Sequence, residues 1–392
     1  MRIAQVVSSY HPRMGGVEAH VRRLAQGCVE AGDRVTVLTH QVGNSPADEW
    51  VGGVRVLRFP LTIDSHNYPL SLSLFRHLRL HAADFDLVHA HNYHTIVGQA
   101  AISSRLPFVF TPHYHGTGHT PFAAFVHRLY RPAGGRQFTA ADAVVCVSEA
   151  ERDLVIKDFP NVAGKVVTIP NGTDPKQPAP DEDMATLDDP IVLTVGRLER
   201  HKNIDLIIDA FRALPSSATL VVVGDGPDRA RLEHHAEVIG PGWPVLFTGI
   251  ISDPMLDRLF AQANVVTSAS DHEAFGMTLA EGLASGARVV ASAIPTHAGL
   301  GRLAGVDAPV ALVDPRDTRR FTDLLTASLL AGRIPKGSIK LPSWTEVVGD
   351  IRELYSRLLL QGRTPTADRR GPDMPQLLGL SDAAEPAPTE SA

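Results

Sequence analysis

The sequence predicts an α/β protein built from two doubly wound, mostly parallel β-sheets. Short apolar runs alternate with segments of helical periodicity through most of the 392 residues, as in repeated βαβ units. The runs are continuously apolar, which is typical of strands buried on both faces of a parallel sheet. A stretch rich in Pro and Asp, residues 170–190, separates two such series of similar size and indicates a linker or hinge.

Both series repeat the order of strand and helix. The first predicts strands at Ile3–Val7, Val35–Thr39, Val54–Phe59, Leu87–Ala90, Phe108–Thr111, Ala143–Val147 and Val166–Ile169. The second predicts strands at Ile191–Val195, Thr219–Val223, Val245–Thr248, Val265–Thr267, Arg288–Ala291 and Val310–Val313. Amphipathic helices are expected from about Val17 to Gly32 and over Trp344–Leu360. Residues 364–392 are rich in Pro, Ala, Asp and Glu, so we expect a disordered tail there.

Composition excludes several classes of protein. Hydrophobic residues make up 44% and charged residues 20%, an ordinary globular mixture. We find no apolar run of the ~18–20 residues that a membrane helix needs, and the first apolar run is too short for a signal peptide. The net charge of −6 argues against general nucleic-acid binding. Cys28 and Cys146 form no disulfide framework, so we expect a cytoplasmic protein.

One segment carries the strongest functional signal: DHEAFGMTLAEGLASG, residues 271–286. It follows a predicted strand, and Gly276 stands just before a predicted helix. A Gly there lets a ligand approach the free backbone N–H groups, which with the helix dipole favour an anion such as pyrophosphate. Glu273 precedes the helix and Glu281 lies about one turn inside it, so both can face one ligand. Carboxylates accept hydrogen bonds from sugar hydroxyls.

Two further loops follow predicted strands. GRLERHKN, residues 196–203, places Arg197 and Lys202 where two cations can neutralise a diphosphate leaving group. HPRMGGVEAHV, residues 11–21, opens the first helix with Gly15 and Gly16, a second point where backbone can approach a ligand. GDGPDR, residues 224–229, lacks the third Gly of a dinucleotide fingerprint, so a nicotinamide site is not expected.

Histidine is abundant, with 18 residues in the chain. HAHNYH (89–94) and HYHGTGH (113–119) lack the spacing and the Cys partners of known zinc motifs, so we expect no metal site. Strand alternation places His89 and His91 on one face, and His113 and His115 likewise. We expect His113 to contact substrate. The acidic runs at residues 84–86 and 181–183 are not expected to bind metal either.

Taken together, these segments resemble retaining glycosyltransferases of family 4, which have the GT-B fold. The segment from Glu273 to Glu281 is similar to the family's Glu-x7-Glu signature. The family's further segments occur in its order: GGVE (15–18), DLVHAHN (86–92), TPH (111–113), VSEAERD (147–153), PNGTD (170–174), GRLERHK (196–202) and GDGP (224–227). The resemblance extends from residue 1 to about residue 360.

The resemblance implies an architecture and residue roles. Two Rossmann-like domains, 1–172 for the acceptor and 173–343 for the donor, would face a central cleft, with helix 344–362 crossing back to the first domain. Glu281 would hold the ribose hydroxyls, and Glu273 would hold the donor sugar. The remaining roles are donor binding by Gly15, Gly16, Phe275, Gly276, Met277 and Thr278, stabilisation of the departing diphosphate by Arg197 and Lys202, and contact of His113 with the sugar.

Two departures from the family pattern concern the nucleotide site. Ala274 stands where the family often has Gly. The segment 294–302, IPTHAGLGR, which we expect to be a loop, lacks the acidic residue usual near Gly299. Contacts to the base or phosphate there are therefore expected to differ from the family pattern.

The resulting hypothesis is transfer of a hexose or N-acetylhexosamine from a nucleotide sugar to a hydroxyl acceptor, with retention and without metal or cofactor. A UDP-sugar is favoured over GDP-mannose. A nucleotide-sugar epimerase, a phosphorylase with pyridoxal phosphate and a non-catalytic sugar-nucleotide-binding protein are alternatives. Residues 68–81, rich in Leu, Phe, Arg and His, fit an acceptor groove, a peripheral membrane contact or an ordinary amphipathic helix.

Overall fold

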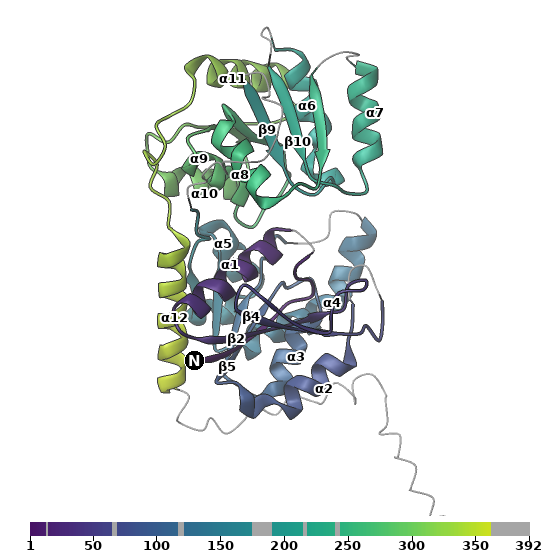
Figure 1. Ribbon diagram of the computed structural model, residues 1–392, viewed down its shortest axis with the longest axis vertical. Coiled ribbons are helices and arrows are strands. Elements are labelled where there is room, and N and C mark those ends of the chain that lie inside the picture. The colour runs from purple at the N-terminus through teal and green to yellow at the C-terminus, as the bar shows by residue number, and fades with distance from the viewer. Residues whose placement is uncertain are drawn as a thin grey trace, which may run out of the picture.

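The computed structural model describes residues 1–12, 15–64, 69–116, 121–174, 190–214, 218–239 and 244–361, with only the backbone described over 121–129. Figure 1 shows two α/β units stacked along the long axis of the molecule, each with a central sheet and helices on its faces. The predicted linker beyond residue 174 and the predicted tail lie outside the described residues.

The first sheet has the order β3-β4-β2-β1-β5-β6-β7-β8 within the described chain. Its strands are β1 (Arg2–Val6), β2 (Arg34–His40), β3 (Asp48–Val51), β4 (Val54–Phe59), β5 (Leu87–His91), β6 (Phe108–Thr111), β7 (Ala143–Cys146) and β8 (Val166–Thr168). All neighbours pair in parallel except β3 and β4. The order reverses at β1, so the loops that follow β1 and β5 flank a crevice at the carboxyl edge.

The second sheet is parallel throughout its described strands, in the order β11-β10-β9-β12-β13-β14. The strands are β9 (Ile191–Val195), β10 (Thr219–Val223), β11 (Val245–Gly249), β12 (Val265–Ser268), β13 (Arg288–Ser292) and β14 (Val310–Val313). Its order reverses at β9, which puts the loops after β9 and β12 at the corresponding crevice.

Helices cover both faces of each sheet. In the first unit these are α1 (Gly16–Glu30), α2 (Leu72–Leu80), α3 (Val97–Ser104), α4 (Pro121–Ala140) and α5 (Glu149–Asp158), with short 3-10 turns at Ala82–Asp84 and Pro160–Lys165. In the second they are α6 (Ile204–Arg212), α7 (Arg229–Ile239), α8 (Asp253–Gln262), α9 (Met277–Ala284), α10 (Pro295–Ala304) and α11 (Thr318–Ala331), with a 3-10 turn at Arg200–Lys202. None of the described helices is long and apolar enough to cross a membrane.

The last helix, α12 (Trp344–Gln361), returns to the first unit (Figure 1). Its apolar face joins the core between α1 and the first sheet, through Trp344, Val347, Val348, Ile351, Leu354 and Tyr355. Arg352 pairs with the buried Asp33 at 2.6 Å, and Asp33 also binds the N-terminal ammonium at 2.7 Å. The crossing of the C-terminal helix back to the first domain, which the resemblance implies, is therefore confirmed.

Every predicted strand is present, with ends that agree to within a residue. Strand β3 is absent from the predictions because DEWV contains no continuous apolar run; it pairs antiparallel at the sheet edge. The prediction of a loop at 294–302 is wrong, since residues 295–304 form α10. Pro295 occupies the first turn of this helix, where its missing N–H costs nothing.

Close packing of α1 on α12 gives a test of the returning helix. A Cβ added at Gly27 would lie 2.5 Å from Cγ2 of Val348, a stiff β-branched side chain. We expect Gly27→Ala to reduce the free energy of unfolding by about 1–3 kcal/mol through overpacking. In the double variant Gly27→Ala/Val348→Ala, the smaller side chain at 348 should recover part of that loss. Urea unfolding measures both effects.

A matched control lies on the exposed side of α12. A Cβ at Gly349 meets nothing within 4 Å, so Gly349→Ala should stabilise the protein by about 0.5–1 kcal/mol through helix propensity alone. If Gly27→Ala were stabilising as well, the close contact between the helices would be contradicted.

Candidate active site

A pocket lies at the carboxyl ends of the central strands of the second sheet. The loops after β9 and β12, which are adjacent strands, supply most of its wall. The lining residues are Thr194, Val195, Gly196, Arg197, Lys202, Ile204, Ser268, Ser270, Glu273 and Thr278. The structure thus brings together four residues predicted from two separate sequence segments: Arg197, Lys202, Glu273 and Thr278.

An ion pair between Lys202 and Glu273 organises this pocket. Lys202 Nζ lies 2.5 Å from Glu273 Oε1, and both side chains are about one-fifth exposed, at 22% and 23%. Ser270 Oγ donates to the same carboxylate oxygen at 2.9 Å. The sequence motifs locate both ends of the pair but give no sign of the pairing itself, because it depends on how β9 and β12 lie side by side.

This arrangement keeps Glu273 ionised. Burial alone would raise the pKa of the Glu273 carboxyl, but the charge and hydrogen bond of Lys202 outweigh it, with help from His297 and Ser270, and the pKa falls below its ordinary value. The backbone is fixed as well, because Thr296 Oγ1 donates to the Glu273 carbonyl at 2.7 Å. Glu273 is therefore a positioned carboxylate that accepts hydrogen bonds.

Helix α9 begins beside this pair. Gly276 precedes its first residue with a φ of 86°, a left-handed conformation that favours glycine, and no described side chain caps the helix there. Its first N–H groups are therefore available to an anion. Thr278 lines the pocket. Phe275 is buried in the core of the second unit, whereas Met277 packs against the cores of both units.

Glu281, the second signature glutamate, is half-buried in the second turn of α9. It is not among the described residues that line the pocket, so its predicted contact with the ribose stays a prediction. Arg197 also lines the pocket, with its guanidinium 2.9 Å from Glu199.

The first unit contributes two predicted features. Gly16 is the first residue of α1, and a Cβ added there meets nothing within 4 Å, whereas one at Gly15 would collide with the Glu18 carboxylate. His113 follows β6, is buried, and has a left-handed φ of 46°. Because β6 ends at Thr111, strand alternation does not extend to His115.

Histidine contacts are more extensive than the sequence indicates. His113 lies beside His20 and His91, with ring centroids 5.0 and 6.0 Å away. His20 was not predicted to belong to a site, since α1 is remote from these strands in sequence. His115 instead stacks on His94 of the first unit, at 4.4 Å, and contacts His272 of the second at 4.9 Å.

The acidic run at residues 84–86 lies at the opposite edge of the first sheet from the carboxyl ends of the strands. Asp86 forms an ion pair with Arg2 at 2.6 Å, at the amino end of β5 and far from the carboxyl edge. Residues 181–183 lie outside the described residues.

Direct contacts hold the two units together at the carboxyl edges. Arg22 of α1 pairs with Asp253 of α8 at 2.9 Å. Ser148 Oγ, before α5, donates to the carbonyl of Ala274 at 2.7 Å. Ala274 is the position at which the sequence departs from the usual Gly, and its backbone takes part in this contact.

Two parallel-sheet units whose carboxyl edges meet, with a cationic pocket at a helix N-terminus, define a transferase of the GT-B class. Two family models match successive parts of the chain: Glycosyltransferase Family 4 at residues 14–177 and Glycosyl transferases group 1 at residues 179–325. The chain belongs to the family-4 type of GT-B glycosyltransferases.

Individual proteins agree with this assignment. A glycosyltransferase of Methanocaldococcus jannaschii is 28% identical over 331 residues, which are 75% of this chain and 81% of that protein. Two solved structures share the fold. Sucrose-phosphate synthase from Thermosynechococcus elongatus has a TM-score of 0.70, 21% identity and 92% and 100% coverage of the two chains. Anabaena HepE in complex with UDP-glucose has a TM-score of 0.62 and 17% identity, and the match covers 92% of this chain and 98% of that chain.

The Lys202–Glu273 pair predicts a pH-dependent stability. In the native protein the lowered pKa of Glu273 stabilises the fold above the ordinary carboxyl pKa, and this contribution is lost as the pH falls through the folded-state pKa. Lys202→Met leaves the carboxylate unpaired, and burial then raises its pKa. We expect a loss of about 1–3 kcal/mol in unfolding free energy near pH 7. This loss should begin to narrow as the pH falls through the raised pKa of the variant, and it should narrow further below about 4.3, where the native carboxyl also takes up its proton.

Urea unfolding of the native protein and of Lys202→Met, near pH 7 and again below about pH 4.3, measures how the loss of stability changes with pH. The double variant Lys202→Met/Glu273→Gln carries no unpaired charge, so it should lose less stability near pH 7 and show little dependence on pH. An equal loss for Lys202→Met at both pH values would mean that the pair does not govern the charge of Glu273.

Proposed function

We propose that this glycosyltransferase moves a hexose or N-acetylhexosamine from a nucleoside diphosphate sugar to a hydroxyl acceptor, with retention at the anomeric carbon. The observation that carries the proposal is the pocket in which Lys202 and Arg197 stand beside the uncapped start of α9. Two cations and a helix N-terminus suit a diphosphate leaving group.

The state of Glu273 supports a mechanism without a covalent intermediate. Its carboxylate accepts from Lys202 and Ser270, an environment that suits binding of sugar hydroxyls better than attack on a carbon. A retaining glycosidase needs two carboxylates that flank the bond. Here the acceptor hydroxyl attacks from the side of the leaving phosphate, which takes its proton while Lys202 and Arg197 stabilise the negative charge.

A UDP-sugar is the proposed donor. The fold of Anabaena HepE, which holds UDP-glucose, covers nearly all of this chain, and GDP-mannose is the competing donor. His113, on the first unit, is proposed to contact the donor sugar, and Gly16 to admit the donor phosphate. A thermal-shift screen against UDP, GDP and their sugars separates the two bases, since a bound ligand raises stability by mass action.

Substitution of the two signature glutamates tests the proposed site. Glu273→Ala should lower kcat by roughly 10²–10³, the typical effect of losing one well-placed group, because the donor sugar loses its acceptor. Glu281→Ala should mainly weaken donor binding and raise KM. Steady-state assays of sugar transfer, with binding measured by calorimetry, distinguish the two effects.

An exposed glutamate on α12 provides the control, since Glu353→Ala should leave both constants unchanged. Wild-type kinetics for both signature variants would contradict the site. Turnover of the nucleotide sugar without any acceptor would identify an epimerase instead, and donor binding with no release of nucleotide would identify a non-catalytic protein.

Transfer is proposed not to need Mg²⁺ or Mn²⁺ at the diphosphate, because fixed cations occupy that position. We expect most of the rate to persist in excess EDTA. Lys202→Ala should lose the rate, and added Mg²⁺ should not restore it, since no carboxylate pair lines the described pocket to hold the ion. Complete loss in EDTA that Mn²⁺ reverses would contradict this account.

A further inference from the structure

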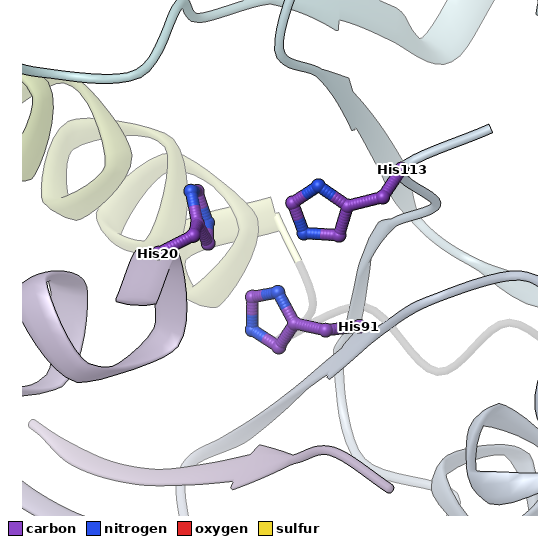
Figure 2. A group of neighbouring side chains, drawn as sticks. All are labelled: His20, His91 and His113. Carbon is purple, nitrogen blue, oxygen red and sulfur yellow. The ribbon is translucent and has the colours of Figure 1, made fainter. Parts of the chain in front are cut away.

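Three buried histidines from distant parts of the chain converge in the first unit. Figure 2 shows His20 on α1, His91 at the end of β5 and His113 after β6 with their rings facing one another. One ring nitrogen of each lies within 4.8 Å of the others, and the three side chains are 2%, 0% and 7% exposed. Among the described residues, no other group of His, Cys, Asp or Glu comes together in this way.

Hydrogen bonds fix which nitrogen of His91 carries a proton. Gln5 Nε2 donates to the Tyr355 hydroxyl at 3.2 Å, so Gln5 Oε1 is the atom that faces His91 Nε2, at 2.6 Å. A carbonyl oxygen only accepts, and His91 Nε2 therefore carries the hydrogen. The lone pair is left on Nδ1, which is buried without a hydrogen-bond partner.

The same logic applies to His20. Its Nδ1 lies 2.7 Å from Asn171 Oδ1 and donates to it, so the lone pair lies on Nε2, which is also buried without a partner. His113 Nε2 is the third buried nitrogen without a partner. Burial lowers the pKa of His20 to about 4 and the pKa values of His91 and His113 well below the ordinary value, so all three rings are neutral near pH 7.

We propose that His20, His91 and His113 form a binding site for a divalent transition metal, best matched by Zn²⁺. His20 and His91 are neutral imidazoles whose other ring nitrogen is held by a hydrogen bond, which is the usual form of a zinc ligand. Three such ligands leave a fourth position for a water molecule. Zn–N bonds of about 2.0–2.1 Å place ligand nitrogens roughly 3.3 Å apart, so loading draws the rings together by at most about 1.5 Å.

The neighbouring His89 illustrates why these three histidines differ from the rest of the cluster. Its ring lies 4.1 Å from that of His91, yet its two nitrogens are engaged by Tyr355, at 2.6 Å, and Thr111, at 2.8 Å. The all-nitrogen donor set also excludes Mg²⁺ and Ca²⁺, which prefer oxygen. The site is thus distinct from any ion at the donor diphosphate.

Metal binding to full-length protein prepared without a histidine tag tests the proposal directly. After treatment with chelator, the protein should bind one Co²⁺ per chain with the intense visible absorption of a four-coordinate ion, and Zn²⁺ should displace it. His20→Gln and His91→Gln should each weaken binding by more than about 100-fold. Asn171→Ala, which removes only the hydrogen-bond partner of His20, should weaken it by about 10–100-fold. His113 is left intact because the proposed function also uses it.

A surface pair provides the matched control. His77 and His81 stack at 4.4 Å near the end of α2, where histidines four residues apart can bind metal adventitiously. The variant His77→Gln/His81→Gln should keep the cobalt spectrum and its stoichiometry. Loss of the spectrum in this variant, wild-type affinity in His20→Gln and His91→Gln, or a wild type without four-coordinate Co²⁺ would each overturn the proposal.

Variants of buried histidines can fail to fold, so the wild type must also be decisive. X-ray absorption of the zinc-loaded wild type counts its imidazole ligands. Three imidazoles support the site, and fewer than three overturn it. These measurements do not involve sugar transfer, so the metal site and the proposed function can fail independently.

Discussion

Close packing of the two connections between the units fixes where the last helix begins: residues 172–174, the described end of the first connection, lie against residues 342–344 of the second. Thr173 on the first connection donates its N–H to the carbonyl of Pro342 on the second, at 2.8 Å. A Cβ at Gly172 would lie 2.6 Å from the backbone of Trp344, so only glycine permits this approach. A hydrogen bond thus joins the two connections, and α12 continues from the second of them into the core of the first unit.

The carboxyl edges of the two sheets meet through direct contacts between the units. The contacts of Arg22 with Asp253 and of Ser148 with Ala274 lie at those edges. Met277, at the start of α9, packs against the cores of both units. The pocket of the second sheet and the histidines of the first therefore lie on the two sides of one interface, across which His115 contacts His272.

Most of the fold could be predicted because its strands are continuous apolar runs bounded by polar turns. Val310–Val313 and Ile191–Val195 are examples whose ends agree with the structure. Strand β3 could not be found, since an edge strand needs no apolar run. Helix α10, which starts at Pro295, was expected to be a loop, since Pro and Gly residues such as those in its sequence are typical of loops.

The candidate site was predictable only where a residue's position at the sheet edge follows from its place after a strand. Lys202, Glu273 and Gly276 were found in this way, because every strand of a parallel sheet ends at the same edge. Their pairing was not predictable, and neither was the convergence of His20 with His91 and His113. Both depend on which strands are neighbours and on the path of α1, which no local pattern in the sequence contains.

The Lys202–Glu273 pair also explains how one cation can serve two partners. An ammonium group has three donors in a tetrahedral arrangement, and one of them is committed to Glu273 Oε1. The other two donors remain for phosphate oxygens, while the Glu273 carboxylate still accepts the hydrogen bond from the Ser270 hydroxyl. Arginine in this position would present a planar fork that a single carboxylate fills. Under the proposed function, a lysine paired to a signature glutamate would hold the sugar-binding carboxylate and the leaving phosphate in register, so that substrate binding and charge stabilisation would depend on the same side chain.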